Sequence, residues 1–325
     1  SFPTRRSSDL STAILPDGTW VLASSEGCGM MCKDPNDPNK YRYQRVAAWP
    51  DCYSVISAGN LLFFFPNMSN YSVFKKDIKI HDGSDKIDSS CMGYHMNTSR
   101  NVAYYGPLNL VYFVNKSKNL KCVDIALEFK ETSIMNSVHD FCFLKDKIYA
   151  LKANATISSI GHRSTVSSME DDKSPSKPVF SNQSAMPGSI ISVNDKTLVV
   201  SSTNRQTDIS DFYVVDAETL AVKGSLIRWE PLKGVRISPV LWLKHYPRSL
   251  LPPDFPQNVE LVLSCNSTDI VSLLAVVNST DIVPLNSLPV KTNSGYKGID
   301  FMTFIEDRLF LGMGDGAVME VKIQF

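Results

Sequence analysis

Two pairs of residues in this sequence have the types and spacing that could hold a metal ion. Cys28 and Cys32 are separated by three residues, and so are Cys91 and His95. Thiolates and imidazole are the ligands that zinc prefers, but structural zinc sites join their ligand pairs by a short loop. These two pairs lie about sixty residues apart, and methionines flank both, which indicates apolar packing. We therefore predict no metal site and no cofactor.

The sequence offers little for acid–base or nucleophilic catalysis. His139 and Asp140 are adjacent and precede the apolar run 141–144, where such polar residues more often hold the backbone by hydrogen bonds than act on a substrate. No Gly-x-Ser-x-Gly elbow, phosphate-binding loop or dinucleotide fingerprint occurs. We predict no catalytic residues, and an enzyme remains only an alternative.

Composition weighs against two classes of partner. The chain has 33 Lys plus Arg and 33 Asp plus Glu, so its formal net charge is zero. Nucleic-acid binding normally requires a basic field, which this balance does not provide. No run approaches the roughly 18 apolar residues of a membrane-spanning helix. The chain is therefore expected to bind protein, with no nucleic acid and no membrane span.

Asparagine sequons and cysteines point to different compartments. Eight Asn-x-Ser/Thr sites are typical of a secreted or lumenal glycoprotein, although hairpin turns also select Asn, Ser and Thr. Seven cysteines, an odd number without a dense framework, favour a reducing compartment. We expect an intracellular, cytoplasmic protein, with the secretory pathway or the extracellular space as the alternative. The sequons are at Asn67, Asn70, Asn97, Asn115, Asn154, Asn182, Asn266 and Asn278.

The elements that must position any site are strands, because a short apolar run followed by a polar turn recurs along the whole chain. The recurrence has an interval of about 40 to 60 residues, which is typical of β-propeller blades. β-Branched residues dominate, and each run is too short for a helix. The runs are at 20–23, 61–65, 109–114, 147–151, 197–200, 259–263 and 308–311.

Two segments show consecutive antiparallel strands most clearly. Residues 259–283 contain the sequence NSTDIV twice, twelve residues apart (Asn266 and Asn278 begin the copies), which predicts a meander. Residues 299–323 predict three strands, with Asp315-Gly316 as a tight turn before the third. A closing outer strand for this last unit is expected from the other end of the chain, as in many propellers.

Residues 212–222, FYVVDAETLAV, are similar to the strand–turn–strand segment of WD40-like propellers. The chain therefore resembles the divergent WD40-like β-propeller superfamily, although no blade opens with Gly-His or closes with Trp-Asp. The resemblance implies an all-β fold with seven blades of four-stranded antiparallel meanders, and six or eight blades are compatible with the same spacing.

The domain prediction assigns nearly the whole chain to this one fold. Residues 1–10, SFPTRRSSDL, resemble the translation of a sequencing adapter, and residues 11–325 are expected to form a single propeller domain. Two loop insertions are expected. Segment 158–188 is rich in Ser, Pro and charge and predicts a mobile loop. Segment 237–258 is rich in proline and large apolar residues.

The insertion 237–258 is the candidate for partner binding. Large apolar residues on a loop form docking surfaces when they are exposed, but residues 240–243 are also compatible with the inner strand of a blade. The leading hypothesis is a non-catalytic scaffold that mediates protein–protein interaction. The alternatives are a glycoprotein with a ligand-binding propeller, and a propeller enzyme with its site at the central channel. The partner-binding candidates are Leu241, Trp242, Tyr246, Leu250 and Phe255.

Overall fold

A computed structural model describes the greater part of the chain. The described residues are 11–14, 20–24, 27–34, 36–47, 52–58, 61–66, 72–75, 98–115, 117–127, 130–162, 176–180, 185–204, 209–229, 240–266, 270–290, 299–305, 308–313 and 318–323. The chain divides into two compact units, Ser1–Ile134 with Phe310–Glu320, and Met135–Leu309 with Val321–Phe325. Each unit is described by itself.

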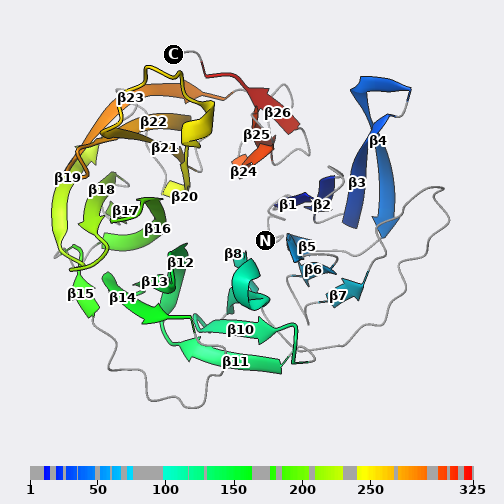
Figure 1. Cartoon of the computed structure of the whole chain (residues 1–325), viewed down its shortest axis with the longest axis horizontal. Helices are drawn as coiled ribbons and strands as arrows, with labels where there is room; N and C mark the ends of the chain where they lie inside the picture. Colours follow the sequence, from blue (N-terminus) through cyan, green and yellow to red (C-terminus); the bar gives the residue numbers. More distant parts are fainter. Residues whose placement is uncertain are drawn as a thin grey trace, which may run out of the picture. The chain divides into compact units, whose positions relative to one another are not determined.

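The first unit contains three antiparallel sheets (Figure 1). The first sheet is β1 (Ser11–Ile14), β2 (Trp20–Ser24), β3 (Gly27–Asp34) and β4 (Asp37–Ala47). The second has three strands, β5 (Cys52–Ala58), β6 (Leu61–Pro66) and β7 (Ser72–Lys75). The third is β8 (Thr98–Tyr105), β9 (Leu110–Asn115), β10 (Leu120–Asp124) and β11 (Lys130–Met135), with the short helix η1 (Gly106–Leu108) after β8.

The second unit contains three four-stranded antiparallel sheets. The first is β12 (Val138–Leu144), β13 (Lys147–Lys152), β14 (Thr156–Gly161) and β15 (Ser176–Pro178). The second is β16 (Ala185–Asn194), β17 (Thr197–Asn204), β18 (Ser210–Asp216) and β19 (Val222–Trp229). The third is β20 (Val240–His245), β21 (Val259–Asn266), β22 (Ile270–Val277) and β23 (Asp281–Pro289), with η3 (Arg248–Leu250) after β20.

A last sheet holds β24 (Ile299–Ile305), β25 (Arg308–Met313) and β26 (Val318–Val321). In the second unit the first strands of consecutive sheets, β12, β16 and β20, are neighbours, while the sheets extend outward from them (Figure 1). Sheets that meet face to face and radiate from their first strands are the blades of a β-propeller. The all-β prediction and the propeller fold are confirmed.

The predicted blade composition needs a correction. Seven four-stranded blades were expected, whereas the described residues form five four-stranded blades and two sheets of three strands, β5–β7 and β24–β26. The recurring apolar runs coincide with β2, β6, β9, β13, β17, β21 and β25, which is the second strand of each sheet. The runs therefore reveal that a sheet is present, but they carry no information about how many strands it has.

β9, β13 and β17 contain continuous apolar runs because both of their faces are covered. In β17 all residues from Thr197 to Thr203 are buried, and β9 and β13 are nearly as enclosed. A strand that is buried on both faces appears in sequence as a continuous apolar run. The first strands are more mixed, and several carry a β-bulge near their start, as β12 does between Val138 and Asp140.

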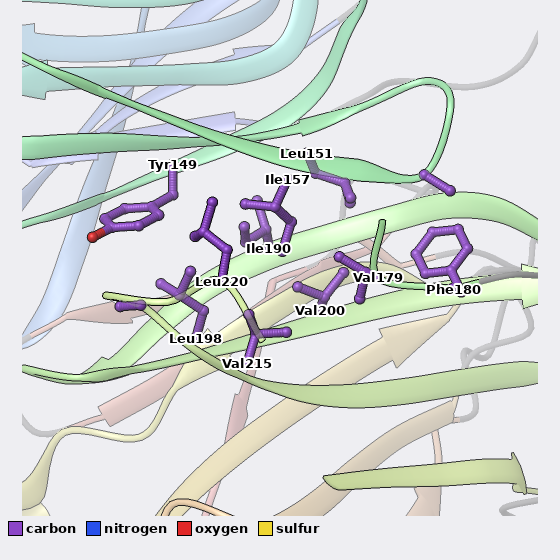
Figure 2. Close-up of a cluster of buried hydrophobic side chains, with 12 residues drawn as sticks. Tyr149, Leu151, Ile157, Val179, Phe180, Ile190, Leu198, Val200, Val215 and Leu220 are labelled. Atoms are coloured by element: carbon purple, nitrogen blue, oxygen red, sulfur yellow. The ribbon is translucent and has the colours of Figure 1, made fainter. Parts of the chain in front are cut away.

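Apolar clusters fill the spaces between adjacent blades. Figure 2 shows the cluster between β12–β15 and β16–β19, where Leu151 and Ile157 meet Ile190, Leu198 and Val200. A second cluster packs Phe212 and Val214 of the next seam against Val262 and Leu274. In the first unit, Val111, Phe113 and Val123 pack against Ala58 of β5. The blades are therefore held together mainly by burial of side chains from facing sheets.

The predicted loop at 158–188 is partly a strand. Residues 158–161 complete β14, residues 176–178 form β15, and β16 begins at Ala185. β15 has only three residues, and its pairing with β14 extends from Thr156↔Pro178 to Ser158↔Ser176. So short an outer strand lacks a detectable alternation, which is why composition alone suggested a loop. Residues 163–175 and 181–184 of the segment lie outside the described residues.

Candidate functional site

The insertion predicted at 237–258 begins as a strand. Val240–His245 form β20, which pairs with β21 and neighbours β16, so the alternative reading of 240–243 as an inner strand is correct. The chain then leaves the sheet at Tyr246, whose amide still donates to Leu261 O at 2.9 Å. The residues from Tyr246 to Asn258 form the connection to β21, which we call the β20–β21 loop.

Arg248 fixes the shape of the β20–β21 loop. Its guanidinium donates to the carbonyl oxygens of Val259 at 2.9 Å, Pro256 at 2.8 Å and Phe255 at 3.4 Å. The planar guanidinium has five donors in a rigid fork, so one side chain can satisfy several backbone acceptors at once. The loop is therefore organised by its own residues.

Glu260 at the start of β21 joins Arg248 to the adjacent strand. Its Oε1 lies 3.8 Å from Arg248 Nη1, and its Oε2 lies 3.0 Å from His245 Nε2. The Glu260 side chain is only 15% exposed, so these contacts are less screened than those of a surface ion pair. Together Arg248, Glu260 and His245 form a polar clamp at the base of the loop.

The tip of the loop consists of two successive turns. Phe255 N donates to Pro252 O at 3.0 Å, and Val259 N donates to Pro256 O at 3.3 Å. Proline suits such turns because its φ angle is already fixed. The exposed residues of the loop are Ser249, Pro252, Pro253, Asp254, Pro256, Gln257 and Asn258. The loop therefore presents proline rings and one carboxylate on a rigid base.

The five predicted partner-binding residues occupy different environments. Tyr246 is 7% exposed and packs edge-on against Phe304 of β24, with the ring centroids 5.2 Å apart. Trp242, Leu250 and Phe255 are half-buried, and the side chain of Leu241 lies outside the described residues. The structure therefore brings Tyr246, Leu250 and Phe255 to one loop, where Tyr246 serves as an anchor.

Sequence reasoning missed the residues that organise this loop. Arg248 and Glu260 are ordinary surface types in sequence, and only the fold brings them together. A usable signal was present, because a single arginine in a proline-rich connection has many carbonyl groups without a ladder partner. The exposed loop tip was not predicted either, because large apolar residues were expected to bind the partner and the exposed residues include prolines.

Other predicted sites are only partly described. Cys91 and His95 lie outside the described residues, as do the side chains of Cys28 and Cys32. Within the part of the chain that the structure describes, no group of three or more His, Cys, Asp or Glu residues could hold a metal ion. Cys122 on β10 and Cys265 on β21 are buried, and Cys142 on β12 is half-buried. Burial raises the pKa of Cys122 to about 12.

Of the described sequon asparagines, Asn154 and Asn278 lie in turns, whereas Asn115 and Asn266 are the last residues of β9 and β21. Asn154 is exposed, and its side-chain oxygen accepts from Thr156 N at 3.3 Å and Thr156 Oγ1 at 2.8 Å. Asn278 is exposed with φ 52°, and its side-chain oxygen accepts from Asn258 Nδ2 at 2.8 Å. These contacts are the ordinary turn chemistry of asparagine.

The predicted structural role of the His139-Asp140 pair is met by Asp140. Its carboxylate accepts from Phe141 N at 2.8 Å and from Ile190 N, on the neighbouring blade, at 2.9 Å. The hydrogen bond from Ile190 N thus holds the first strand of the next blade. Among the described residues, none of the helices is long and apolar enough to span a membrane.

The described strands give this chain the architecture of a β-propeller. No family model matches the sequence, and no curated protein matches it. The WD40 propeller domain of Doa1 is similar with a TM-score of 0.64 and 14% identity, covering 98% of this chain and 93% of that one. The N-terminal domain of Nup159 is similar with a TM-score of 0.62 and 12% identity, covering 98% and 89%.

An enzyme has the same architecture. Virginiamycin B lyase from Staphylococcus aureus is similar with a TM-score of 0.61 and 10% identity, covering 97% of this chain and 94% of that one. At these identities the similarities establish the fold alone, because one fold serves many functions. Function must therefore be argued from the residues of this chain.

Proposed function

We propose that this protein is a non-catalytic propeller scaffold that binds a protein partner through the β20–β21 loop. The observation that carries the proposal is the Arg248 guanidinium, which donates to two loop carbonyl oxygens and to Val259 O of β21 while the loop tip remains exposed. Binding orders a flexible loop at a cost in conformational entropy, and a loop that is already ordered avoids that cost. Loops on a stiff frame commonly carry recognition.

The candidate residues divide into two roles in this proposal. Tyr246 anchors the loop, while the half-buried Leu250 and Phe255 support the exposed Pro252, Pro253 and Asp254. Trp242 and Leu241 belong to β20, beneath the loop. Partner contact is expected at the tip, where proline rings offer apolar area and Asp254 offers a charge. One chain in the crystal structure of the Mitotic Checkpoint Complex has a similar fold, and that chain is part of an assembly.

The proposal includes an intracellular, cytoplasmic location. Cys122 and Cys142 are thiols inside strands and form no disulfide, as expected of a protein that does not depend on an oxidising compartment. Endoglycosidase treatment of protein from its native source should leave its electrophoretic mobility unchanged. A mobility shift that disappears in Asn154→Gln would favour the secretory alternative.

The test of the binding site compares the loop tip with another exposed turn. The variant Pro253→Ser with Asp254→Lys changes the tip and leaves Arg248 intact, whereas Asp195→Lys changes an exposed carboxylate in the β16–β17 turn. Affinity purification from the native source should recover a partner with wild type and Asp195→Lys but lose it with the tip variant. Recovery of the same partner at equal yield by the tip variant would overturn the proposal.

Arg248→Met separates organisation of the loop from contact with the partner. The variant retains every exposed residue of the tip but removes the three hydrogen bonds to the carbonyl oxygens of Phe255, Pro256 and Val259. Once the recovered partner has been purified, its dissociation constant should rise by about tenfold, because the loop must then be ordered on binding. An unchanged dissociation constant would show that the preformed loop is irrelevant.

A further inference from the structure

One buried carboxylate joins two blades of the second unit. Asp140 lies on β12 and is 8% exposed. Its Oδ1 accepts from Phe141 N at 2.8 Å, and its Oδ2 accepts from Ile190 N of β16 at 2.9 Å. The Ser189 hydroxyl also hydrogen-bonds to the carboxylate. The same side chain therefore holds backbone on its own strand and on the first strand of the next blade.

Both strands are bulged at this contact. The register of β12 shifts between Val138 and Asp140, and the register of β16 shifts between Pro187 and Ile190. A bulge leaves a residue outside the ladder and re-aims its neighbours, which here frees an amide for the carboxylate. Within its own blade the β16 bulge is fixed by Ser201, whose Oγ accepts from Ser189 N at 2.8 Å.

The close packing of this bulge requires a glycine. A Cβ atom at Gly188 would collide with the Ser201 hydroxyl and come within 3.1 Å of Ser201 O. The bulge thus has little freedom on the side of its own blade. Its other side faces Asp140, so the seam between β12 and β16 depends on what that carboxyl can accept.

Within the part of the chain that the structure describes, few charged groups act on Asp140. Cys142 on β12 and Tyr149 on β13 have their pKa values raised by burial, so both are neutral near pH 7. β16 carries no titratable residue, and His139 is the neighbour of Asp140 on β12. Lys244 on β20 is the cation whose charge acts on the carboxylate. A buried carboxylate with one cation nearby is costly to ionise.

We propose that Asp140 makes the seam between β12 and β16 proton-dependent: the seam opens more readily when the carboxylate is ionised and is held closed when the carboxyl is protonated. The proton comes from solvent and bonds to one carboxyl oxygen. The protonated group still accepts an amide on its carbonyl oxygen and donates its O–H to the Ser189 hydroxyl. Opening hydrates Asp140, which favours the ionised form.

The direction follows from linkage. Burial is the largest influence on the Asp140 carboxyl and raises its pKa to about 6, against the lowering effects of the Ile190, Ser189 and Phe141 hydrogen bonds and of Lys244. The closed seam therefore binds a proton more tightly than an opened, hydrated seam with an ordinary aspartate pKa of about 3.9. Closure is strongest at low pH and weakens as the pH rises through the interval between those two values.

The test follows hydrogen exchange of the Ile190 amide, corrected for the intrinsic pH dependence of exchange. Protection of a peptide containing Ile190 should fall by about tenfold between pH 5 and pH 7.5 in the wild type. In Asp140→Asn the side chain is neutral at every pH, so this protection should lose its pH dependence. Asp216→Asn, which alters a carboxylate within one blade, should retain the wild-type profile.

Lys244→Gln gives a second readout that a merely structural role for Asp140 would not move. Removing the cation makes ionisation of Asp140 more costly, so the midpoint of the protection profile should shift to higher pH. A wild-type profile that is flat between pH 5 and pH 7.5 overturns the proposal, even if Asp140→Asn fails to fold. Protection that rises with pH, or a shift to lower pH in Lys244→Gln, overturns it as well.

Discussion

Asp140 and Asp216 use the same chemistry in two different regions of the second unit. Asp140 lies in the seam between blades and accepts amides from two sheets. Asp216 ends β18 and accepts from Thr219 N at 2.8 Å, from Glu218 N at 3.1 Å and from the Thr219 hydroxyl at 2.9 Å. Both carboxylates satisfy backbone donors that the ladder leaves unpaired.

The two carboxyl groups nevertheless have opposite pKa shifts. At Asp216 the hydrogen bond from Thr219 N has the largest effect and lowers the pKa, whereas at Asp140 burial has the largest effect and raises it to about 6. Hydrogen bonds favour the charged form of both carboxylates, but at Asp140 the cost of removing the group from solvent is larger than their effect. A turn within a blade is therefore shaped by local polar chemistry, and a seam between blades is governed by burial.

Truncation of a seam residue should give the largest effect. Phe212 is fully buried between β16–β19 and β20–β23 and meets Trp229 edge-on, with the ring centroids 5.6 Å apart. Phe212→Ala should lower the free energy of unfolding by about 3–5 kcal/mol, because it leaves a cavity between two blades. Urea denaturation measures the change. Val222→Ala, at a side chain that is 40% exposed, should cost less than about 0.5 kcal/mol.

An intermediate effect is expected where the backbones of two blades come together. A Cβ atom at Gly224 of β19 would collide with Thr280 O, in the turn of the next blade. Gly224→Ala should cost about 1–3 kcal/mol, since backbone must shift to admit the methyl group. Gly161→Ala is the matched control, because its Cβ would lie 4.0 Å from Asp146 O. Equal thermal unfolding midpoints for the two variants would show that the seam is loosely packed at its outer edge.

The same contrast explains what the sequence could reveal. The meander at 259–283 appears as β21, β22 and β23, and the last unit appears as β24, β25 and β26, because alternation and turn residues act between near neighbours. The contact of Asp140 with Ile190 joins residues 50 positions apart, and no local pattern announces it. The number of strands in each blade could not be predicted for a related reason. An outer strand can be as short as β15, which has three residues and is recognised only through its pairing with β14.

The candidate site shows the same division. The position of the loop after an inner strand was predictable from the proline-rich segment following an apolar run. The burial of Tyr246 against Phe304 was not, because β24 lies more than fifty residues further along the chain. Large apolar residues after an inner strand pack inward when a neighbouring sheet is available, and the exposed positions pass to prolines and polar residues.

A smaller effect is expected at the turn that Asp216 shapes. Asp216→Asn should lower the free energy of unfolding by about 1 kcal/mol at pH 7, because hydrogen bonds to a charged acceptor contribute more than those to a neutral one. The loss stays small because asparagine also suits such turns. The folded-state pKa is lowered, so the advantage of the aspartate is present above the ordinary pKa and is lost as the pH falls through the folded value. The two proteins should therefore have similar stability near pH 2 in chemical denaturation. A difference that grows on acidification would contradict the local account of this turn.

The smallest effect is expected where a carboxylate has neither burial nor amides to hold. Asp195 in the β16–β17 turn lies 3.8 Å from Lys145 Nζ, and the two side chains are 82% and 56% exposed. Asp195→Asn should change the free energy of unfolding by less than about 0.5 kcal/mol, because solvent screens an exposed ion pair. A cost as large as that of Asp216→Asn would mean that charge alone, without amide contacts, stabilises these turns. Chemical denaturation of Asp195→Asn beside Asp216→Asn, at low and at high salt, separates the two, since only a charge effect weakens as salt is added.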